Sequence, residues 1–173
     1  MPEKRQYNKV VIVDENDTVI GAENMLVARE KGLLRSGVRG FVFSQSGDVL
    51  VQRRGKAVLR SLQLDISASG GVDEGETRIE AARRELAEET GITGFEPVCV
   101  AEPFRSPGTI NAVYKVEVPD DISFSFDSSE VDSLLWMQPK ELDQLIATTA
   151  SQYTPGLRDT WAQLRDTLIH TES

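Results

Sequence analysis

Two residue types that build many enzyme sites are scarce in this sequence, which has one cysteine, Cys99, and one histidine, His170. A single cysteine excludes an intramolecular disulfide, so we expect a chain that works in a reducing compartment. Cys99 lies in an apolar pattern and is expected to be a small buried residue rather than a nucleophile. A single histidine excludes a histidine-based catalytic triad and a metal site built from several histidines.

Long apolar runs and an excess of positive charge are also missing. No run approaches the roughly 18 apolar residues of a membrane span, and the first residues lack the apolar segment of a signal peptide. The 28 acidic residues outnumber the 19 basic ones, which gives a net charge of −9 and a pI near 4.7. We therefore expect a cytoplasmic protein that binds neither membranes nor nucleic acid. An anionic ligand would need a bound cation and a local basic cluster.

The order of apolar and turn-forming segments indicates a single α/β domain over residues 1–173. An N-terminal hairpin is expected over residues 9–21, with its turn at Glu15-Asn16-Asp17. The other expected helices and strands of a mixed sheet are helices over Glu23–Leu34, Pro139–Ala147 and Pro155–Ile169, and strands over Val38–Ser44, Asp48–Gln52, Leu64–Ala68, Pro97–Ala101, Thr109–Val118 and Leu134–Met137.

The most informative segment is residues 70–92, where glycines frame a helix that is rich in glutamate. Thr77 followed by Glu80 is a capping-box pair, so the helix is expected to begin near Arg78. Gly91 suits the left-handed position that ends a helix.

Three acids of this helix, Glu85, Glu88 and Glu89, are spaced i, i+3, i+4 and therefore share one face. Like charges so close together destabilise a bare helix. They suit a hard divalent cation such as Mg²⁺, which prefers oxygen ligands. The alternative is an acidic helix face that is simply solvated.

Residues 70–92 resemble the Nudix box: Gly, five residues, Glu, seven residues, Arg-Glu, an aliphatic residue, any residue, Glu-Glu, any residue, Gly and an aliphatic residue. Its fixed positions are filled by Gly70, Glu76, Arg84, Glu85, Leu86, Glu88, Glu89, Gly91 and Ile92. The resemblance implies an α/β/α sandwich with a mixed β-sheet, in which the box helix forms the metal site. It also implies Mg²⁺, with Mn²⁺ as a substitute, bound by the Gly70 carbonyl, Glu85, Glu88 and Glu89.

The same resemblance assigns catalytic roles. Arg84 would orient the glutamates and Glu76 would fix the geometry between loop and helix, although the two could also form a purely structural pair. Glu85, or another nearby carboxylate, would accept the proton of a metal-activated water. Glu130 precedes an expected strand, at a place where Nudix hydrolases often supply an additional carboxylate; a surface glutamate is the alternative.

Basic residues gather just before the box, in a cluster made of Arg53, Arg54, Lys56 and Arg60. Arg53 and Lys56 are predicted to contact the substrate diphosphate, because an arginine fork suits phosphate oxygens and lysine supplies a point charge. The alternative is that these are plain surface charges. Phe104, Arg105 and Tyr114 are candidates for the lining of the substrate pocket, although strand aromatics more often belong to the core.

The resemblance favours a Mg²⁺-dependent pyrophosphohydrolase that cleaves a diphosphate linkage in a nucleoside di- or triphosphate or a nucleotide sugar. The expected partner is this small-molecule diphosphate; the implied fold is compatible with a homodimer. A non-catalytic, nucleotide-sensing Nudix module is an alternative. The segments flanking the box resemble the subgroup that includes isopentenyl diphosphate isomerase, but Ala68, Gly70 and Arg35 stand where that enzyme has its catalytic cysteine and two histidines.

Overall fold

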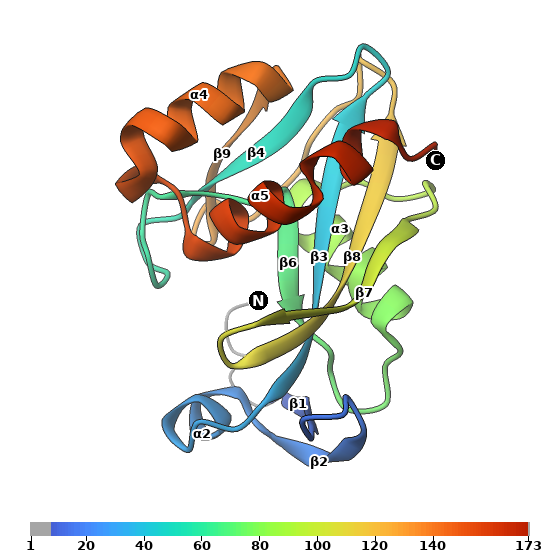
Figure 1. Cartoon of the computed structure of the whole chain (residues 1–173), viewed down its shortest axis with the longest axis vertical. Helices are drawn as coiled ribbons and strands as arrows, with labels where there is room; N and C mark the ends of the chain where they lie inside the picture. The colour runs from blue at the N-terminus through green and yellow to red at the C-terminus, as the bar shows by residue number, and fades with distance from the viewer. Residues whose placement is uncertain (1–7, 173) are drawn as a thin grey trace.

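The computed structural model describes residues 8–172, which form one mixed sheet with helices on both sides (Figure 1). In this range the sheet has nine strands, paired in the order β2-β1-β3-β4-β5, with β6 and β8 also paired to β3, β7 to β8, and β9 to β4. The strands are β1 (Lys9–Val13), β2 (Val19–Asn24), β3 (Arg35–Ser44), β4 (Val49–Arg54), β5 (Leu64–Asp65), β6 (Ala68–Gly71), β7 (Val98–Ser106), β8 (Thr109–Val118) and β9 (Val131–Met137). The helices of the same range are α2 (Met25–Glu30), α3 (Arg78–Thr90), α4 (Pro139–Thr149) and α5 (Pro155–His170), with a 3₁₀ turn at Ala150–Gln152.

The strand β3 lies at the centre of the sheet, parallel to β8 and antiparallel to β1, β4 and β6. Its residues Phe41 and Phe43 pack in a cluster with Trp161 of α5, whereas Val42 packs in a cluster with Leu86 of α3. Because successive strand residues point to opposite faces, α3 covers one face of the sheet and α5 covers the other. The predicted α/β/α sandwich with a mixed sheet is confirmed.

The N-terminal hairpin forms as predicted, but the helix after it is shorter than expected. Asn24 caps α2, since its side chain accepts from two backbone N–H groups of the first turn. Gly32 then adopts a left-handed backbone with φ of 64°, which turns the chain out of the helix. The predicted extension to Leu34 is therefore wrong; Leu33 packs against buried residues of β1 instead.

The box helix α3 begins and ends where the sequence predicts. The Glu80 N–H donates to the Thr77 hydroxyl at 3.4 Å, and the Thr77 N–H donates to the Glu80 carboxylate at 2.8 Å, which completes the capping box. Gly91 ends the helix with a left-handed φ of 77°. Ala82 and Leu86 are buried against the sheet. One side of α3 is thereby anchored while its acidic side is left for other contacts.

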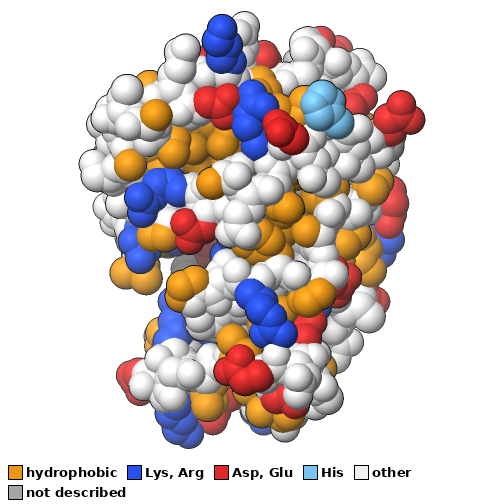
Figure 2. Space-filling view, viewed as in Figure 1, with side chains coloured by type: hydrophobic (Ala, Val, Ile, Leu, Met, Phe, Trp, Pro, Cys, Tyr) orange, Lys and Arg blue, Asp and Glu red, His pale blue; other side chains and the backbone are white. Residues whose placement is uncertain are grey.

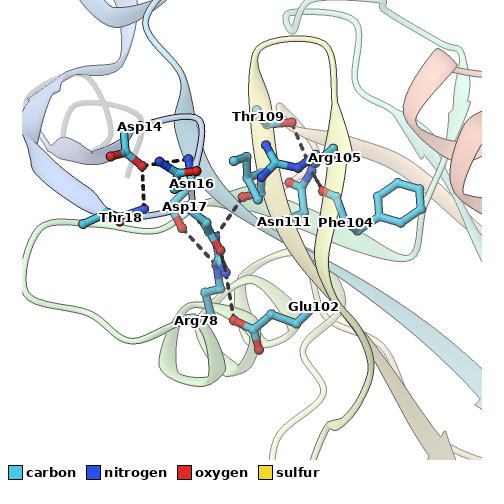
Figure 3. Close-up of polar contacts among 12 residues, drawn as sticks. Asp14, Asn16, Asp17, Thr18, Arg78, Glu102, Phe104, Arg105, Thr109 and Asn111 are labelled. Carbon is cyan, nitrogen blue, oxygen red and sulfur yellow. Dashed lines mark hydrogen bonds and ion pairs between the residues drawn. The ribbon is translucent and has the colours of Figure 1, made fainter.

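Arg78 ties the loop of the N-terminal hairpin to the first turn of α3 (Figure 3). It donates to both carboxylate oxygens of Asp17, at 2.6 and 2.7 Å, and to Glu102 of β7 at 2.8 Å. Burial alone would lower the pKa of Arg78, but the hydrogen bonds to these two acids raise it overall. The hairpin, the box helix and β7 are thus joined at one partly buried cation.

The surface of the molecule places the two rare residues of the sequence outside the core. On the face shown in Figure 2, acidic and basic side chains are interspersed, and His170 is exposed at the end of α5. Cys99 is exposed on β7, so the prediction that it is buried is wrong. The strand β7 pairs only with β8 and forms an edge of the sheet. No helix within residues 8–172 has the length and apolar character that crossing a bilayer requires.

Candidate active site

A cavity of about 880 Å³ lies at the box, between α3, β3, β6 and the loop before β9. Its lining includes Gly70, Glu85, Glu88 and Glu89, together with Glu130 from that loop. The volume is within the range of small-molecule sites. The structure thus brings together the four residues predicted to bind a metal and an additional carboxylate that is distant in sequence.

At Gly70, strand β6 lies close to the Glu85 side chain of helix α3. A Cβ atom at this position would overlap the carboxylate of Glu85, so any larger side chain would have to displace that carboxylate. Glu85 and Glu89 are almost fully buried, with 4% and 8% of their surface exposed, while Glu88 is exposed. The box therefore presents two buried carboxylates and one exposed carboxylate to the cavity.

Arg84 is the hub of the hydrogen bonds among these acids. Its guanidinium donates to both carboxylate oxygens of Glu76, at 2.7 and 2.9 Å, to Glu85 at 2.6 Å and to the Gly71 carbonyl at 2.9 Å. Glu88 lies 3.6 Å away. Burial alone would lower the pKa of Arg84, but the bonds to Glu76 and the charge of Glu85 raise it overall. One side chain links the loop, β6 and the helix face.

Glu89 is held by two residues that the sequence analysis did not single out. The Gln52 side-chain amide donates to its carboxylate at 3.0 Å, and the Ser69 backbone N–H donates at 3.0 Å. The Gln52 amide also donates to the Ser67 carbonyl at 3.1 Å, which fixes its orientation. A polar Gln52 directly after the apolar run Val49–Val51 is the sequence signal that points to this role.

The donor set of the cavity fits a hard divalent cation. Three carboxylates and the Gly70 carbonyl are all oxygen donors, and a Cβ at Gly70 would fill the space beside Glu85. Among the described residues, however, no three metal-ligating side chains stand together as a finished ligand cluster. The box acids are instead engaged by Arg84, Gln52 and Ser69. Metal binding would exchange some of these hydrogen bonds for coordination.

The loop before β9 brings two carboxylates, those of Glu130 and Asp127, to the lining of the cavity. The Glu130 carbonyl accepts from the Gly55 N–H at 2.8 Å, and a Cβ at Gly55 would overlap the backbone of Ser129 and Glu130. The loop is therefore seated directly on the end of β4. Asp127 lines the cavity as well, and its carboxylate accepts from the Ser129 N–H at 2.8 Å. This local turn pattern is a signal for Asp127 that the sequence analysis missed.

Of the basic cluster before the box, Arg54 lines the cavity, whereas Arg53 and Lys56 do not. Gln52, two residues before Arg54 on β4, points to the box acids, and the intervening Arg53 belongs to the other side of the strand. Arg54 is oriented by an ion pair with Asp65 at 2.8 Å. The diphosphate contacts predicted for Arg53 and Lys56 stay predictions, and the shape of the cavity favours Arg54.

Three further arginines line the cavity, Arg29 from α2 and Arg35 and Arg39 from β3. Arg39 has 9% of its surface exposed, and it donates to the Thr160 hydroxyl at 2.5 Å. Its guanidinium lies 5.3 Å from the centre of the Phe104 ring. A charged residue between Val38 and Phe41 of β3 is the sequence signal for Arg39.

The remaining predicted substrate residues lie outside the cavity lining. Phe104 is buried in the core cluster that contains Phe41 and Trp161. This agrees with the alternative given above, that strand aromatics belong to the core. Arg105 donates to the Glu15 carbonyl at 2.6 Å and so contacts the N-terminal hairpin. Substrate contacts for both residues are not supported by this arrangement, because their side chains are committed to other neighbours.

Comparison with known proteins agrees with the box geometry. The NUDIX domain family model matches residues 33–159, which include the whole box, the arginines of β3 and β4 and the loop before β9. This chain belongs to the Nudix family. Among its curated relatives is an uncharacterised Nudix hydrolase of Yersinia pestis, 30% identical over 157 residues, which covers 84% of this chain and 79% of the relative. The family match and this relative confirm the prediction that the chain is an enzyme of the Nudix pyrophosphohydrolase class.

The chain is also similar to an isomerase with a related sequence and to a solved structure. An isopentenyl-diphosphate Delta-isomerase of Nocardia farcinica is 30% identical over 161 residues, covering 87% of this chain and 90% of the relative. This agrees with the predicted similarity in the segments flanking the box. A crystal structure of a Deinococcus radiodurans protein superposes with a TM-score of 0.70 at 25% identity, covering 82% of this chain and 90% of that one.

Proposed function

We propose that this Nudix enzyme hydrolyses a diphosphate linkage in a nucleoside diphosphate derivative, either a nucleoside di- or triphosphate or a nucleotide sugar, with Mg²⁺ or Mn²⁺. The observation that carries the proposal is the shared cavity, in which the box acids and Gly70 form one wall and arginines form another. A diphosphate needs both walls in a chain of net charge −9. Without the cation, the acids would repel the substrate.

The metal would be held by Glu85, Glu88, Glu89 and the Gly70 carbonyl. When bound, it neutralises phosphate charge and lowers the pKa of a water that it coordinates. Arg84 keeps Glu85 in place through its bond at 2.6 Å, and Glu76 in turn holds two nitrogens of Arg84. Arg84 is thus a positioning residue rather than a substrate contact.

Two carboxylates are candidates for the proton acceptor, Glu85 on the box helix and Glu130 on the loop before β9. A carboxylate oxygen would take the proton from the water that attacks phosphorus. Arg54 would contact the non-bridging oxygens of the diphosphate, since its fork matches their geometry. Excess negative charge on the departing phosphate would then be stabilised inside the cavity.

The proposal is tested by incubating the purified protein with Mg²⁺ and a panel of nucleotides, nucleotide sugars and dinucleoside polyphosphates. Release of phosphate and pyrophosphate is measured after each reaction, and phosphomonoester products are measured through a coupled phosphatase. Glu89→Gln should abolish turnover, whereas Glu96→Gln, an exposed substitution at the Arg83 ion pair, should leave it within about twofold because exposed pairs contribute little. Tight binding with no turnover of any compound would support a nucleotide-sensing module instead.

The isomerase alternative meets a chemical difficulty in this cavity. That reaction adds and removes protons at carbon, and the described lining of the cavity contains neither cysteine nor histidine. Ala68 is buried on β6, His170 is exposed at the end of α5, and Cys99 is exposed on β7. Conversion of isopentenyl diphosphate to its isomer by the purified protein would nevertheless overturn the hydrolase proposal.

A further inference from the structure

A side pocket of about 320 Å³ opens beside the main cavity and shares Arg29, Arg39, Arg54, Leu59 and Ser69 with it. None of the box acids lines this side pocket. Arg60, from the loop between β4 and β5, completes its lining with a fourth arginine. The side pocket is therefore a basic extension of the active-site cavity, one that lies away from the residues that would hold the metal.

The charges of the side pocket do not cancel. Its two acids are Asp65 and Asp159. Asp65 is already engaged, since it accepts from Arg54 at 2.8 Å and from the Thr154 hydroxyl at 2.7 Å. Only the exposed Asp159 is left to balance three further arginines. The side pocket thus carries a net positive charge in a protein whose overall charge is strongly negative.

Arg39 is unusual because it is a buried cation without an ion-pair partner among the described residues. It is nine-tenths buried, and within residues 8–172 no carboxylate forms an ion pair with it. Its contacts are the neutral Thr160 hydroxyl and the face of the Phe104 ring. A buried cation is costly unless an anion compensates it. Because Arg39 lines both cavities, an anionic ligand group in the side pocket would supply that compensation.

We propose that the side pocket is a second anion subsite, which binds a phosphate group of the substrate other than the diphosphate that is cleaved. This rests on the proposed function. The substrate is then a compound with two halves joined by a diphosphate, and the half that lies in the side pocket carries an additional phosphate. Arg39 binds that group from inside, and Arg29 and Arg60 bind it from the exposed rim.

Paired substrates that differ by one phosphate test this directly. Hydrolysis is compared for NADPH against NADH and for coenzyme A against dephospho-coenzyme A, with kcat/KM measured for each. The compound with the additional phosphate should be preferred by about tenfold in at least one pair, as expected for one charge-assisted contact of roughly 1.4 kcal/mol. Ratios near one in every hydrolysed pair would overturn the proposal.

Variants of the exposed rim show whether the arginines cause the preference. The double variant Arg29→Gln/Arg60→Gln should reduce the preference to about twofold or less, because rim charges are then absent. The charge-matched double variant Arg83→Gln/Lys140→Gln, at exposed positions outside both cavities, should retain it. Arg39→Gln should act more strongly, but it is buried and could fail to fold, so the rim variant decides.

A binding measurement separates this inference from the proposed function. Inorganic phosphate is titrated against the metal-free protein by calorimetry, for the wild type, both double variants and Glu89→Gln. If neither the panel compounds nor either pair is hydrolysed but phosphate affinity falls about tenfold in Arg29→Gln/Arg60→Gln alone, the subsite stands and the hydrolase proposal fails. Equal phosphate affinity in all four proteins would overturn the subsite, whatever the enzyme hydrolyses.

Discussion

Arg84 donates to both carboxylate oxygens of Glu76, at 2.7 and 2.9 Å, and uses a third nitrogen for Glu85 at 2.6 Å. The bond to Glu76 spans the loop and the helix, so the acidic face of α3 is positioned from outside the helix. The planar fork of arginine is needed for this arrangement, because three directions are satisfied at once.

Arg84→Lys should therefore lower kcat/KM about 100-fold while the protein remains folded, since an ammonium cannot hold Glu76 and Glu85 together. The measurement is steady-state hydrolysis of the best panel substrate, with circular dichroism as the check on folding. Arg83→Lys is the matched control, because Arg83 is exposed and pairs only with Glu96. A loss of the same size in the control would refute the positioning role of Arg84.

Gly70→Ala should destabilise the protein by about 1–3 kcal/mol, the usual cost of overpacking, because a Cβ there would overlap the Glu85 carboxylate. Gly156→Ala should have the opposite effect of about 0.5 kcal/mol, since Gly156 lies in α5, a Cβ there would make only ordinary van der Waals contacts with Arg39 and Thr154, and alanine favours a helix. Urea unfolding at neutral pH measures both changes. Two changes of equal sign and size would contradict the close approach of β6 to α3.

Glu76 makes the stability of the box depend on pH. Burial alone would raise the pKa of Glu76, but hydrogen bonds from Arg84 and from the Asp73 N–H lower it overall. Because the folded pKa lies below the unfolded value of about 4.3, ionised Glu76 contributes stability above that pH. This contribution is lost as the pH falls through the folded pKa.

Wild type should thus exceed Glu76→Gln in unfolding free energy by about 1–2 kcal/mol at pH 7, a value reduced by the one-fifth exposure of the side chain. The difference should shrink as the pH falls below about 4. The measurement is denaturant unfolding of both proteins across this pH range. A difference that stays constant with pH would show that Glu76 acts through packing and not through its charge.

Gln52→Leu should raise the Mg²⁺ concentration for half-maximal activity about tenfold, because Glu89 would lose the amide that orients it. Gln63→Leu is the control, since that amide donates to the Ser151 carbonyl and lies outside the main cavity. Activity is measured over a Mg²⁺ titration for each protein. An unchanged Mg²⁺ requirement in Gln52→Leu would show that Glu89 needs no such support.

Adjacent arginines of β4 give a test of side-chain direction. Arg54→Gln should raise KM about tenfold or more because Arg54 lines the cavity, whereas Arg53→Gln should change it by about twofold or less. Arg54 also pairs with Asp65, so unfolding is measured alongside to separate binding from folding. The reverse result would restore Arg53 as the substrate contact.

The box could be predicted from the sequence because its signals are local. Capping by Thr77, termination at Gly91 and the common face of the three glutamates depend on residues within one helix. The family pattern then implied the α/β/α sandwich. These features need no knowledge of distant contacts, so the sequence by itself determined the fold class and the acidic wall of the site.

The arginine wall was decided only by the tertiary structure. Arg29, Arg35, Arg39 and Arg54 come from three separate elements, and no local pattern says that they meet. Whether Arg54 or Arg53 lines the cavity depends on which face of β4 is directed toward the box, and the pairing of the strands sets this face. Sequence spacing fixes neighbours along one element, whereas strand register and packing between layers fix which elements share a cavity.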